Sequence, residues 1–128
     1  MSEFVDLTRV LCRLGELDAT GCREFRLGRG DWPMRGFVVR SAVGVHAYVN
    51  RCAHQSLQLN YDKDRFLSHD NAVIVCFVHG ALFTKDTGYC IAGPCSGLSL
   101  ARVPIKLIDD CVMLADEADP EEFAARYA

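Results

Sequence analysis

The sequence predicts an all-β fold, a barrel or sandwich of short strands with a short helix at the C-terminal end. Two observations predict it. Segments of strand length, either continuously apolar or alternating between apolar and polar residues, recur along the chain. Turn-forming residues separate them at intervals of roughly 8–12 residues, a spacing typical of all-β barrels and sandwiches.

The first strands are expected in the first two thirds of the chain. Residues 22–28 (CREFRLG) alternate apolar and polar side chains, as a half-buried strand does. Residues 36–50 (GFVVRSAVGVHAYVN) predict a hairpin that turns around Gly44. Residues 71–77 (NAVIVCF) are a nearly continuous apolar run, which predicts a further strand.

Two more hairpins are expected after this run. Residues 81–90 (ALFTKDTGYC) predict a hairpin that turns at residues 85–88. Residues 100–116 (LARVPIKLIDDCVMLAD) predict two strands that turn at Asp109–Asp110. These strands complete the predicted all-β body.

The predicted helix occupies residues 119–128 (DPEEFAARYA). Asp119 is a suitable N-cap, Pro120 suits the first helical position, and Glu121 and Glu122 complement the helix dipole in the first turn. The helix is therefore expected to begin at residue 120.

Length and composition indicate a single domain, residues 1–128, because the chain has the size of one ordinary domain and half of it is hydrophobic. A net charge of −3 argues against nucleic acid as a partner. The first residues lack the pattern of a signal peptide and no run is apolar enough to span a membrane, so we expect a cytoplasmic protein. In that compartment seven cysteines favour metal binding over disulfides.

Two short motifs pair a cysteine with a histidine. Cys52 and His54 form Cys-x-His, and after 21 residues Cys76 and His79 form Cys-x-x-His. Thiolate and imidazole ligands suit zinc, copper or an iron–sulfur cluster. The common zinc finger has two cysteines first and two histidines second, whereas here each motif supplies one of each. If the motifs meet, two cysteines can hold one iron and two histidines another, the ligand set of a Rieske [2Fe–2S] centre.

The segments around these motifs resemble the Rieske domain family, specifically the small soluble Rieske-type ferredoxins. CAHQSLQL (residues 52–59) resembles the first cluster-binding segment of the family, and CFVHGALF (residues 76–83) resembles the second. TGYCIAGPCSGLSLARVPI (residues 87–105) resembles the segment that follows, with its turn at Gly93–Pro94 over the cluster. The resemblance extends from about residue 37 to residue 114.

The resemblance implies a fold and a set of cluster ligands. The fold would be an antiparallel β-sandwich with a small inserted cluster-binding subdomain, at approximately residues 50–96. Cys52 and Cys76 would ligate the inner iron of one [2Fe–2S] cluster, and His54 and His79 the outer iron near solvent. Neutral imidazole ligands raise the reduction potential above that of four-cysteine ferredoxins.

Several positions depart from the family pattern. Phe77 replaces the usual proline, and Leu57 and Val78 stand where some members carry two cysteines that form a disulfide. Ala81 and Phe83 stand where high-potential members carry serine and tyrosine hydroxyls, which predicts a potential near the low end of the Rieske range. The charged insert at residues 61–70 (YDKDRFLSHD) is expected to be an exposed excursion that takes part in docking.

The remaining cysteines have other interpretations. Cys12, Cys22 and Cys111 lie in strand-like settings and are expected to be small core residues. Cys90 and Cys95 could form a disulfide or serve as redox thiols, but for a reducing compartment we expect packed free thiols.

The other two histidines are not expected to bind metal. His46 alternates with apolar residues, so it is predicted on the solvent side of a strand, and His69 lies in the charged insert. For the two Cys–His motifs, a structural zinc site or unrelated buried cysteines and surface histidines are the alternatives to a cluster.

The resemblance implies a one-electron carrier, which is not itself an enzyme. It would take electrons from a flavin reductase and pass them to a terminal acceptor such as a ring-hydroxylating oxygenase. The alternative is an accessory or regulatory small subunit of a redox enzyme, similar to that of assimilatory nitrite reductase, or a redox sensor. The net charge and the insert predict docking that depends on ionic strength.

Overall fold

The computed structural model describes residues 9–28, 33–52, 58–95 and 97–127. Within these residues the strands form three antiparallel sheets of three strands each, in the orders β1-β9-β8, β2-β3-β4 and β5-β6-β7. The strands are β1 (Val10–Arg13), β2 (Cys22–Leu27), β3 (Met34–Ser41), β4 (Gly44–Val49), β5 (Ile74–Val75), β6 (Leu82–Phe83), β7 (Cys90–Ala92), β8 (Ile105–Ile108) and β9 (Cys111–Leu114). Among the described residues a 3₁₀ helix, η2 (Leu14–Leu17), follows β1, and one α-helix, α1 (Pro120–Tyr127), follows β9.

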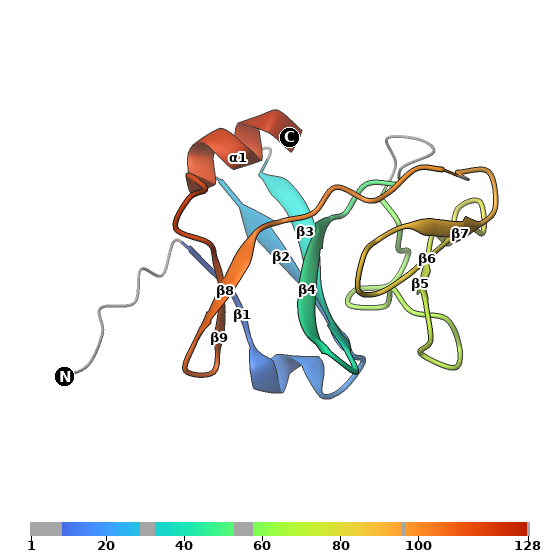
Figure 1. The fold of residues 1–128 in the computed structure, drawn as a ribbon, viewed down its shortest axis with the longest axis horizontal. Coiled ribbons are helices and arrows are strands. Elements are labelled where there is room, and N and C mark those ends of the chain that lie inside the picture. The colour runs from blue at the N-terminus through green and yellow to red at the C-terminus, as the bar shows by residue number, and fades with distance from the viewer. Residues whose placement is uncertain (1–8, 29–32, 53–57, 96, 128) are drawn as a thin grey trace.

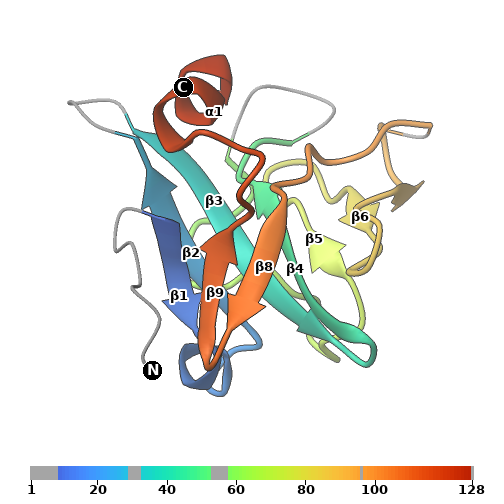
Figure 2. The same cartoon turned by 60° about the vertical axis from the view of Figure 1, so that its left-hand side comes forward.

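The β2-β3-β4 sheet stands in the middle of the molecule and is covered on both faces (Figure 1). One face packs with the β1-β9-β8 sheet and α1, and the other meets the β5-β6-β7 side (Figures 1 and 2). Side chains alternate along β3, so Val38 enters one core while its neighbours Phe37 and Val39 enter the other. A sheet that is buried on both faces explains why the middle of β3, residues 36–39, has no polar side chain.

Two hydrophobic cores result, one on each face of this sheet. The first core holds the framework together and consists of Leu11, Cys12, Leu17, Phe25, Leu27, Met34, Val38, Ala47, Val49, Val103, Val112, Leu114, Phe123 and Ala124. The second core lies on the side of the two Cys–His motifs and consists of Cys22, Phe37, Val39, Tyr48, Cys52, Leu59, Phe66, Ile74, Cys76, Ala81, Phe83, Cys90, Cys95 and Leu100. Five of the seven cysteines therefore lie in the second core.

The three predicted hairpins are confirmed, with small differences at their turns. The first turns at Ala42 and Val43, and Gly44 opens β4 opposite Ser41. The β8–β9 hairpin turns at Asp109–Asp110 as predicted, and Asp109 adopts a φ of 53° there. A left-handed residue suits a two-residue hairpin, and Asp is one of the few non-glycine residues that tolerate it.

One strand prediction needs correction, and one strand had no predicted bounds. The apolar run at residues 71–77 forms only the two-residue strand β5, because residue 76 leaves the sheet and begins a turn. Strand β1 was given no bounds from the sequence, although Cys12 was expected in a strand-like setting. It forms by pairing with β9, where Arg13 lies opposite Cys111, and a partner about a hundred residues away leaves no local pattern.

Helix α1 begins as the sequence predicts. Asp119 caps it, since its Oδ2 accepts the backbone N–H of Glu122 at 2.9 Å. Phe123 and Ala124 are buried against the first core. Among the described residues, no helix is long and apolar enough to cross a membrane.

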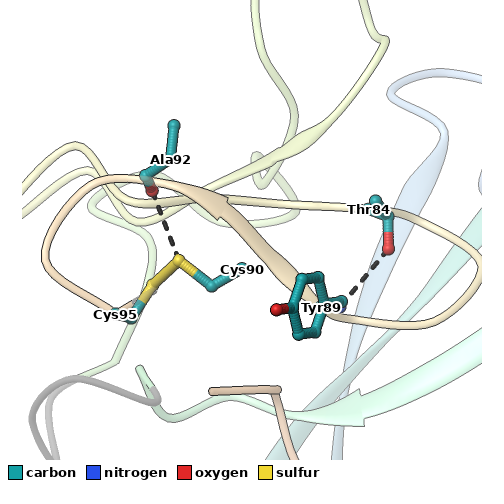
Figure 3. The surroundings of a disulfide bond; sticks show 5 residues. All are labelled: Thr84, Tyr89, Cys90, Ala92 and Cys95. Carbon is teal, nitrogen blue, oxygen red and sulfur yellow. Dashed lines mark hydrogen bonds between the residues drawn. A yellow bond between two sulfur atoms is a disulfide. The ribbon is translucent and has the colours of Figure 1, made fainter. Parts of the chain in front are cut away.

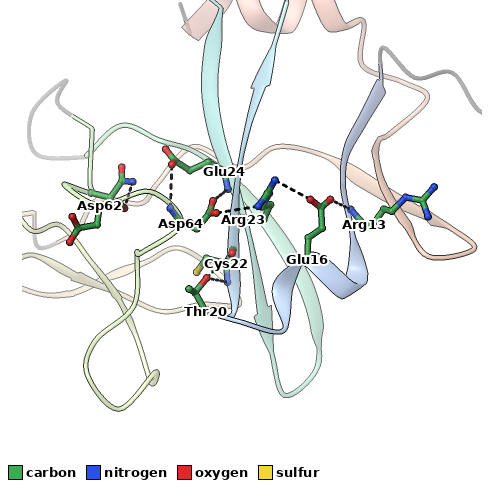
Figure 4. A network of polar contacts seen from close by, with 9 residues as sticks. Arg13, Glu16, Thr20, Cys22, Arg23, Glu24, Asp62 and Asp64 are labelled. Carbon is green, nitrogen blue, oxygen red and sulfur yellow. Dashed lines mark hydrogen bonds and ion pairs between the residues drawn. The ribbon is translucent and has the colours of Figure 1, made fainter.

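The charged insert is less exposed than predicted, because its centre is tied to β2 (Figure 4). Asp64 accepts the backbone N–H of Glu24 at 2.7 Å, and its own N–H donates to the Glu24 carboxylate at 3.2 Å. Arg23 adds an ion pair to Asp64 at 3.3 Å. Phe66 is fully buried in the second core and stacks on Phe37 with ring centroids 4.1 Å apart. The insert is thus anchored at Asp64 and Phe66, while Tyr61 and His69 remain exposed.

Candidate metal centre

The two motif cysteines meet in the second core. Cys52 lies three residues after the end of β4, and Cys76 follows β5 directly. Both side chains are buried in the same core, and the neighbouring Cys52 thiol adds to the burial that raises the pKa of Cys76. The fold therefore brings together two thiols that are 24 positions apart in the sequence, as the predicted site requires.

A tight turn after Cys76 surrounds its sulfur with backbone groups. The N–H of Gly80 donates to the carbonyl of Cys76 at 2.7 Å, and the N–H of Cys76 donates to the carbonyl of Ala81 at 2.8 Å. Burial raises the pKa of the Cys76 thiol, while backbone hydrogen bonds from His79 and Val78 partly lower that pKa. The N–H groups of His79 and Val78 stabilise negative charge on the Cys76 sulfur, which is the charge that a thiolate ligand carries.

The histidine of the second motif lies at the solvent side of this turn. His79 is exposed, whereas Cys76, three residues earlier, is fully buried. His54 of the first motif lies outside the described residues. Over the part of the chain that is described, no cluster of three or more His, Cys, Asp or Glu side chains is preassembled for a metal ion. The structure thus pairs Cys52 with Cys76 and places His79 at the edge next to them.

One sequence prediction was wrong in residues 87–105, which we name the covering segment. Cys90 and Cys95 form a disulfide with a Cα–Cα distance of 5.9 Å, not a pair of free thiols (Figure 3). The N–H of Cys90 donates to the carbonyl of Leu98 at 2.9 Å, and the N–H of Leu98 donates to the carbonyl of Cys95 at 2.9 Å. This turn brings the two cysteines within bonding range, a local effect that an argument from cellular compartment does not include.

The covering segment packs beside residues 76–83, named the second ligand segment. Ala92 in β7 pairs with Leu82 in β6, and Cys90 pairs with Phe83. The disulfide is buried in the same core as Cys52 and Cys76. The covering segment is therefore in direct contact with the candidate site.

The remaining cysteines are placed mostly as predicted. Cys12 and Cys22 are buried core residues, and burial raises the pKa of each thiol to about 12. Such thiols stay protonated at neutral pH and are poor ligands and nucleophiles. Cys111 differs from the prediction, because it is only partly buried at the start of β9.

The two other histidines lie outside the site. His46 is half-buried in β4 opposite Val39, with a ring nitrogen 2.8 Å from the Ser41 hydroxyl. Burial and Arg102 lower its pKa. His69 is exposed in the insert, as predicted.

The stretch that contains His79 and the stretch that pairs with it lack charged side chains and expose several apolar ones. Residues 71–84 and 87–101 contain no Asp, Glu, Lys or Arg, although such residues make up 24% of the chain. Four of the seven large hydrophobic side chains that are exposed among the described residues lie on these two stretches: Phe77 (41% exposed), Tyr89 (47%), Ile91 (53%) and Leu98 (46%). Surface of this kind marks a binding face more often than a bare solvent face.

Sequence reasoning missed two buried amides beside the site, Asn50 and Asn60. Asn50 directly follows β4 and precedes Cys52 by two residues. A polar residue at the end of an apolar strand, next to a candidate ligand, is the signal that could have indicated it.

Comparison with known proteins agrees with this architecture. The family model described as "Rieske [2Fe-2S] domain" matches residues 10–108. No curated protein matches the chain. The chain belongs to the Rieske [2Fe–2S] domain family, whose domain binds a [2Fe–2S] cluster, and the antiparallel fold predicted from the resemblance is confirmed.

Solved structures similar to this chain include ferredoxins and oxygenases. The Sphingomonas yanoikuyae B1 ferredoxin has a TM-score of 0.63 at 20% identity, with 84% of this chain and 96% of that chain covered. The ferredoxin of carbazole 1,9a-dioxygenase from Nocardioides aromaticivorans IC177 has a TM-score of 0.62 at 22% identity, with 83% and 94% covered. The terminal oxygenase of carbazole 1,9a-dioxygenase from Novosphingobium sp. KA1 also matches, with a TM-score of 0.63 at 18% identity, but only 30% of that chain is covered against 88% of this one.

Proposed function

We propose that this protein is a one-electron carrier of the Rieske-type ferredoxin class, with one [2Fe–2S] cluster held by Cys52, His54, Cys76 and His79. The observation that carries the proposal is the burial of Cys52 and Cys76 in one core, next to the exposed His79. Two thiolates on the inner side and imidazole on the solvent side are the donor set of a Rieske centre.

When bound, the cluster accepts and releases one electron. Cys52 and Cys76 would each supply a thiolate from the dry side, and the N–H groups of Val78 and His79 would stabilise the charge on Cys76. His79 would supply a neutral imidazole at the surface, and the exposed edge of that ring would be the route by which electrons enter and leave. His54 is assigned to the second imidazole position from the motif alone.

The partners we propose are a flavoprotein reductase as donor and a terminal oxygenase as acceptor. One similar structure is described as a complex of reduced oxygenase and oxidised ferredoxin in carbazole 1,9a-dioxygenase, with a TM-score of 0.61 at 24% identity. The uncharged face around His79 is where such partners would dock, because an electron must pass within a short distance of the imidazole edge. The chain would then supply electrons and leave the substrate chemistry to its partner.

The test of cluster binding is chemical analysis of protein purified without air. We expect about two irons and two sulfides per chain, a red-brown colour, and uptake of one electron per chain on titration with dithionite. Stoichiometric zinc in place of iron and sulfide would overturn the proposal.

The alternative function is an accessory or regulatory subunit of a larger redox enzyme, or a redox sensor. A carrier turns over with a separate reductase and oxygenase, whereas an accessory subunit copurifies in a fixed ratio with its catalytic partner. Rapid reduction by a flavoprotein reductase followed by reoxidation with an oxygenase supports the carrier. A stable stoichiometric complex that does not exchange supports the subunit.

A further inference from the structure

Two asparagines form a hydrogen-bonded pair that links the two ends of residues 52–59, named the first ligand segment. Asn50 and Asn60 are 6% and 3% exposed, and they are the buried polar residues among those the structure describes. Nδ2 of Asn50 donates to Oδ1 of Asn60 at 2.9 Å. Oδ1 of Asn50 accepts the backbone N–H of Leu59 at 2.8 Å. The side chain of Asn50, which precedes the first motif, therefore binds Leu59 and Asn60, which follow it.

The network around this pair is complete. Nδ2 of Asn60 donates to the carbonyl of Asp62 at 2.9 Å, and Nε2 of Gln58 donates to the carbonyl of Asn60 at 3.0 Å. Within the described part of the chain, no buried side-chain nitrogen or oxygen lacks a hydrogen-bond partner. A buried network with every member satisfied is rigid, and removal of one member leaves its partners unsatisfied where water does not reach them.

The same network reaches the second ligand segment. The carbonyl of Leu59 accepts the backbone N–H of Phe77, the residue after Cys76, at 2.8 Å. The backbone N–H of Asn50 donates to the carbonyl of Arg35 at 2.8 Å, which anchors it to β3. A hydrogen-bonded path thus runs from β3 through Asn50 and Leu59 to Phe77. It joins the backbone on either side of Cys52 to the backbone beside Cys76.

We propose that Asn50 is a positioning residue for the cluster, and that its side chain fixes how the two ligand segments lie relative to each other. The inference rests on the proposed ligand set. Asn50 does not contribute a ligand. It holds Leu59, and through Leu59 it holds Phe77, so that the thiols of Cys52 and Cys76 keep the spacing that one iron requires.

The experiment compares three variants with the wild type as loaded protein. Asn50→Leu removes both side-chain hydrogen bonds at similar volume. Asn50→Asp keeps an oxygen for the Leu59 N–H but loses the donor to Asn60. Val112→Ala shortens a buried side chain in the first core, so it lowers stability without touching the path to the ligand segments.

Two readouts report on the site and not on folding alone: the electron paramagnetic resonance g-values of the reduced cluster, and the rate of iron release to a chelator. For Asn50→Leu we expect shifted g-values and iron release at least about tenfold faster, since two buried partners lose their hydrogen bonds. Asn50→Asp should give a smaller change in both readouts. Val112→Ala should leave the g-values at their wild-type positions.

Wild-type g-values and wild-type iron release in Asn50→Leu would overturn the inference. If Asn50→Leu does not fold, the same result in Asn50→Asp overturns it. Failure of the proposed function is distinguishable, because the wild type itself would then hold no iron and sulfide. Amide hydrogen exchange of Leu59 and Phe77 in cluster-free protein still tests the path in that case: both amides should exchange about tenfold faster in Asn50→Leu than in the wild type.

Discussion

Gly93 of the covering segment lies so close to Ala81 of the second ligand segment that a β-carbon at residue 93 would come within 2.8 Å of the Ala81 Cα. The atom that such a β-carbon would meet belongs to the backbone, so no flexible side chain can move aside. The turn around Gly93 therefore packs closely against Ala81, two positions after His79.

Substitution of Gly93 by alanine should both strain this turn and push it away from the site. Gly97 is a matched control, because its φ of +87° is close to the +97° of Gly93 while a β-carbon there meets no atom within 4 Å. Gly97→Ala should cost about 1–2 kcal/mol from backbone strain alone. Gly93→Ala should cost a further ~1–3 kcal/mol from overpacking and should speed iron release. Urea unfolding and chelator kinetics measure both effects, and equal behaviour of the two variants would contradict this view of the contact.

His79→Ala should abolish the assembled cluster, because the imidazole is proposed to fill an iron coordination position. His69→Ala is the control, since His69 is an exposed histidine of the insert and its loss should change stability by less than about 0.5 kcal/mol. The visible spectrum and the iron content of both variants decide the matter. A complete cluster in His79→Ala would remove this residue from the ligand set.

The Cys90–Cys95 disulfide should stabilise the fold without being needed for the cluster. A double serine variant should keep the visible spectrum, because neither sulfur is a proposed ligand. It should lose on the order of 2 kcal/mol of unfolding free energy, the chain-entropy value for so short a closed loop. Chemical denaturation with and without a dithiol reductant measures the loss. A colourless double variant would show that the disulfide is required for cluster binding.

The reduction potential should lie near the low end of the Rieske range, about −150 mV. Ala81 and Phe83 are both fully buried beside the candidate site, and neither side chain has a hydroxyl to donate toward a cluster sulfur. Ala81→Ser and Phe83→Tyr should therefore raise the potential, while Ala92→Ser, on the exposed surface of β7, should not. A redox titration measures all four proteins. A wild-type midpoint well above 0 mV would defeat the hydrogen-bond argument.

The structure changes the expected effect of salt on electron transfer. Net charge and the insert favoured charge-steered docking, but residues 71–84, which include His79, and residues 87–101 carry no charged side chain. Charge-steered association falls tenfold or more with added salt. We now expect less than about a threefold change in the rate of reduction between low and high salt, because an apolar face is not screened. A steep decline measured by stopped-flow would place docking on the charged surface instead.

Much of the fold was predictable because local patterns encode it. Alternating and apolar strands, the turn at Asp109–Asp110 and the Asp119 cap are all properties of adjacent residues. That Cys52 and Cys76 lie in one core agrees with their motifs, whose spacing and residue types limit the chemistry, while their role as ligands remains a prediction. His54 remains a prediction from its motif, because it lies outside the described residues.

Other features depend on contacts between distant segments, and local patterns do not contain them. Strand β1 exists because β9 pairs with it, and the insert is anchored because Asp64 meets Glu24, 40 positions away. The prediction of free thiols at Cys90 and Cys95 was wrong because it considered only the reducing cytoplasm. It did not consider the turn that brings the two cysteines together. The Asn50–Asn60 pair was missed because it depends on a contact across ten positions, and only the place of Asn50 at the end of an apolar strand hints at it.

The separation of the two cores has a consequence for repair. The first core contains β1, β9 and α1, so the elements nearest both ends of the chain pack together without any side chain of the candidate site. We expect this half to remain folded when the cluster is destroyed, for example by oxygen, and only the half around Cys52 and Cys76 to loosen. The folded first core would then allow a new cluster to be inserted, so loss of the cluster would not lead to degradation of the whole chain.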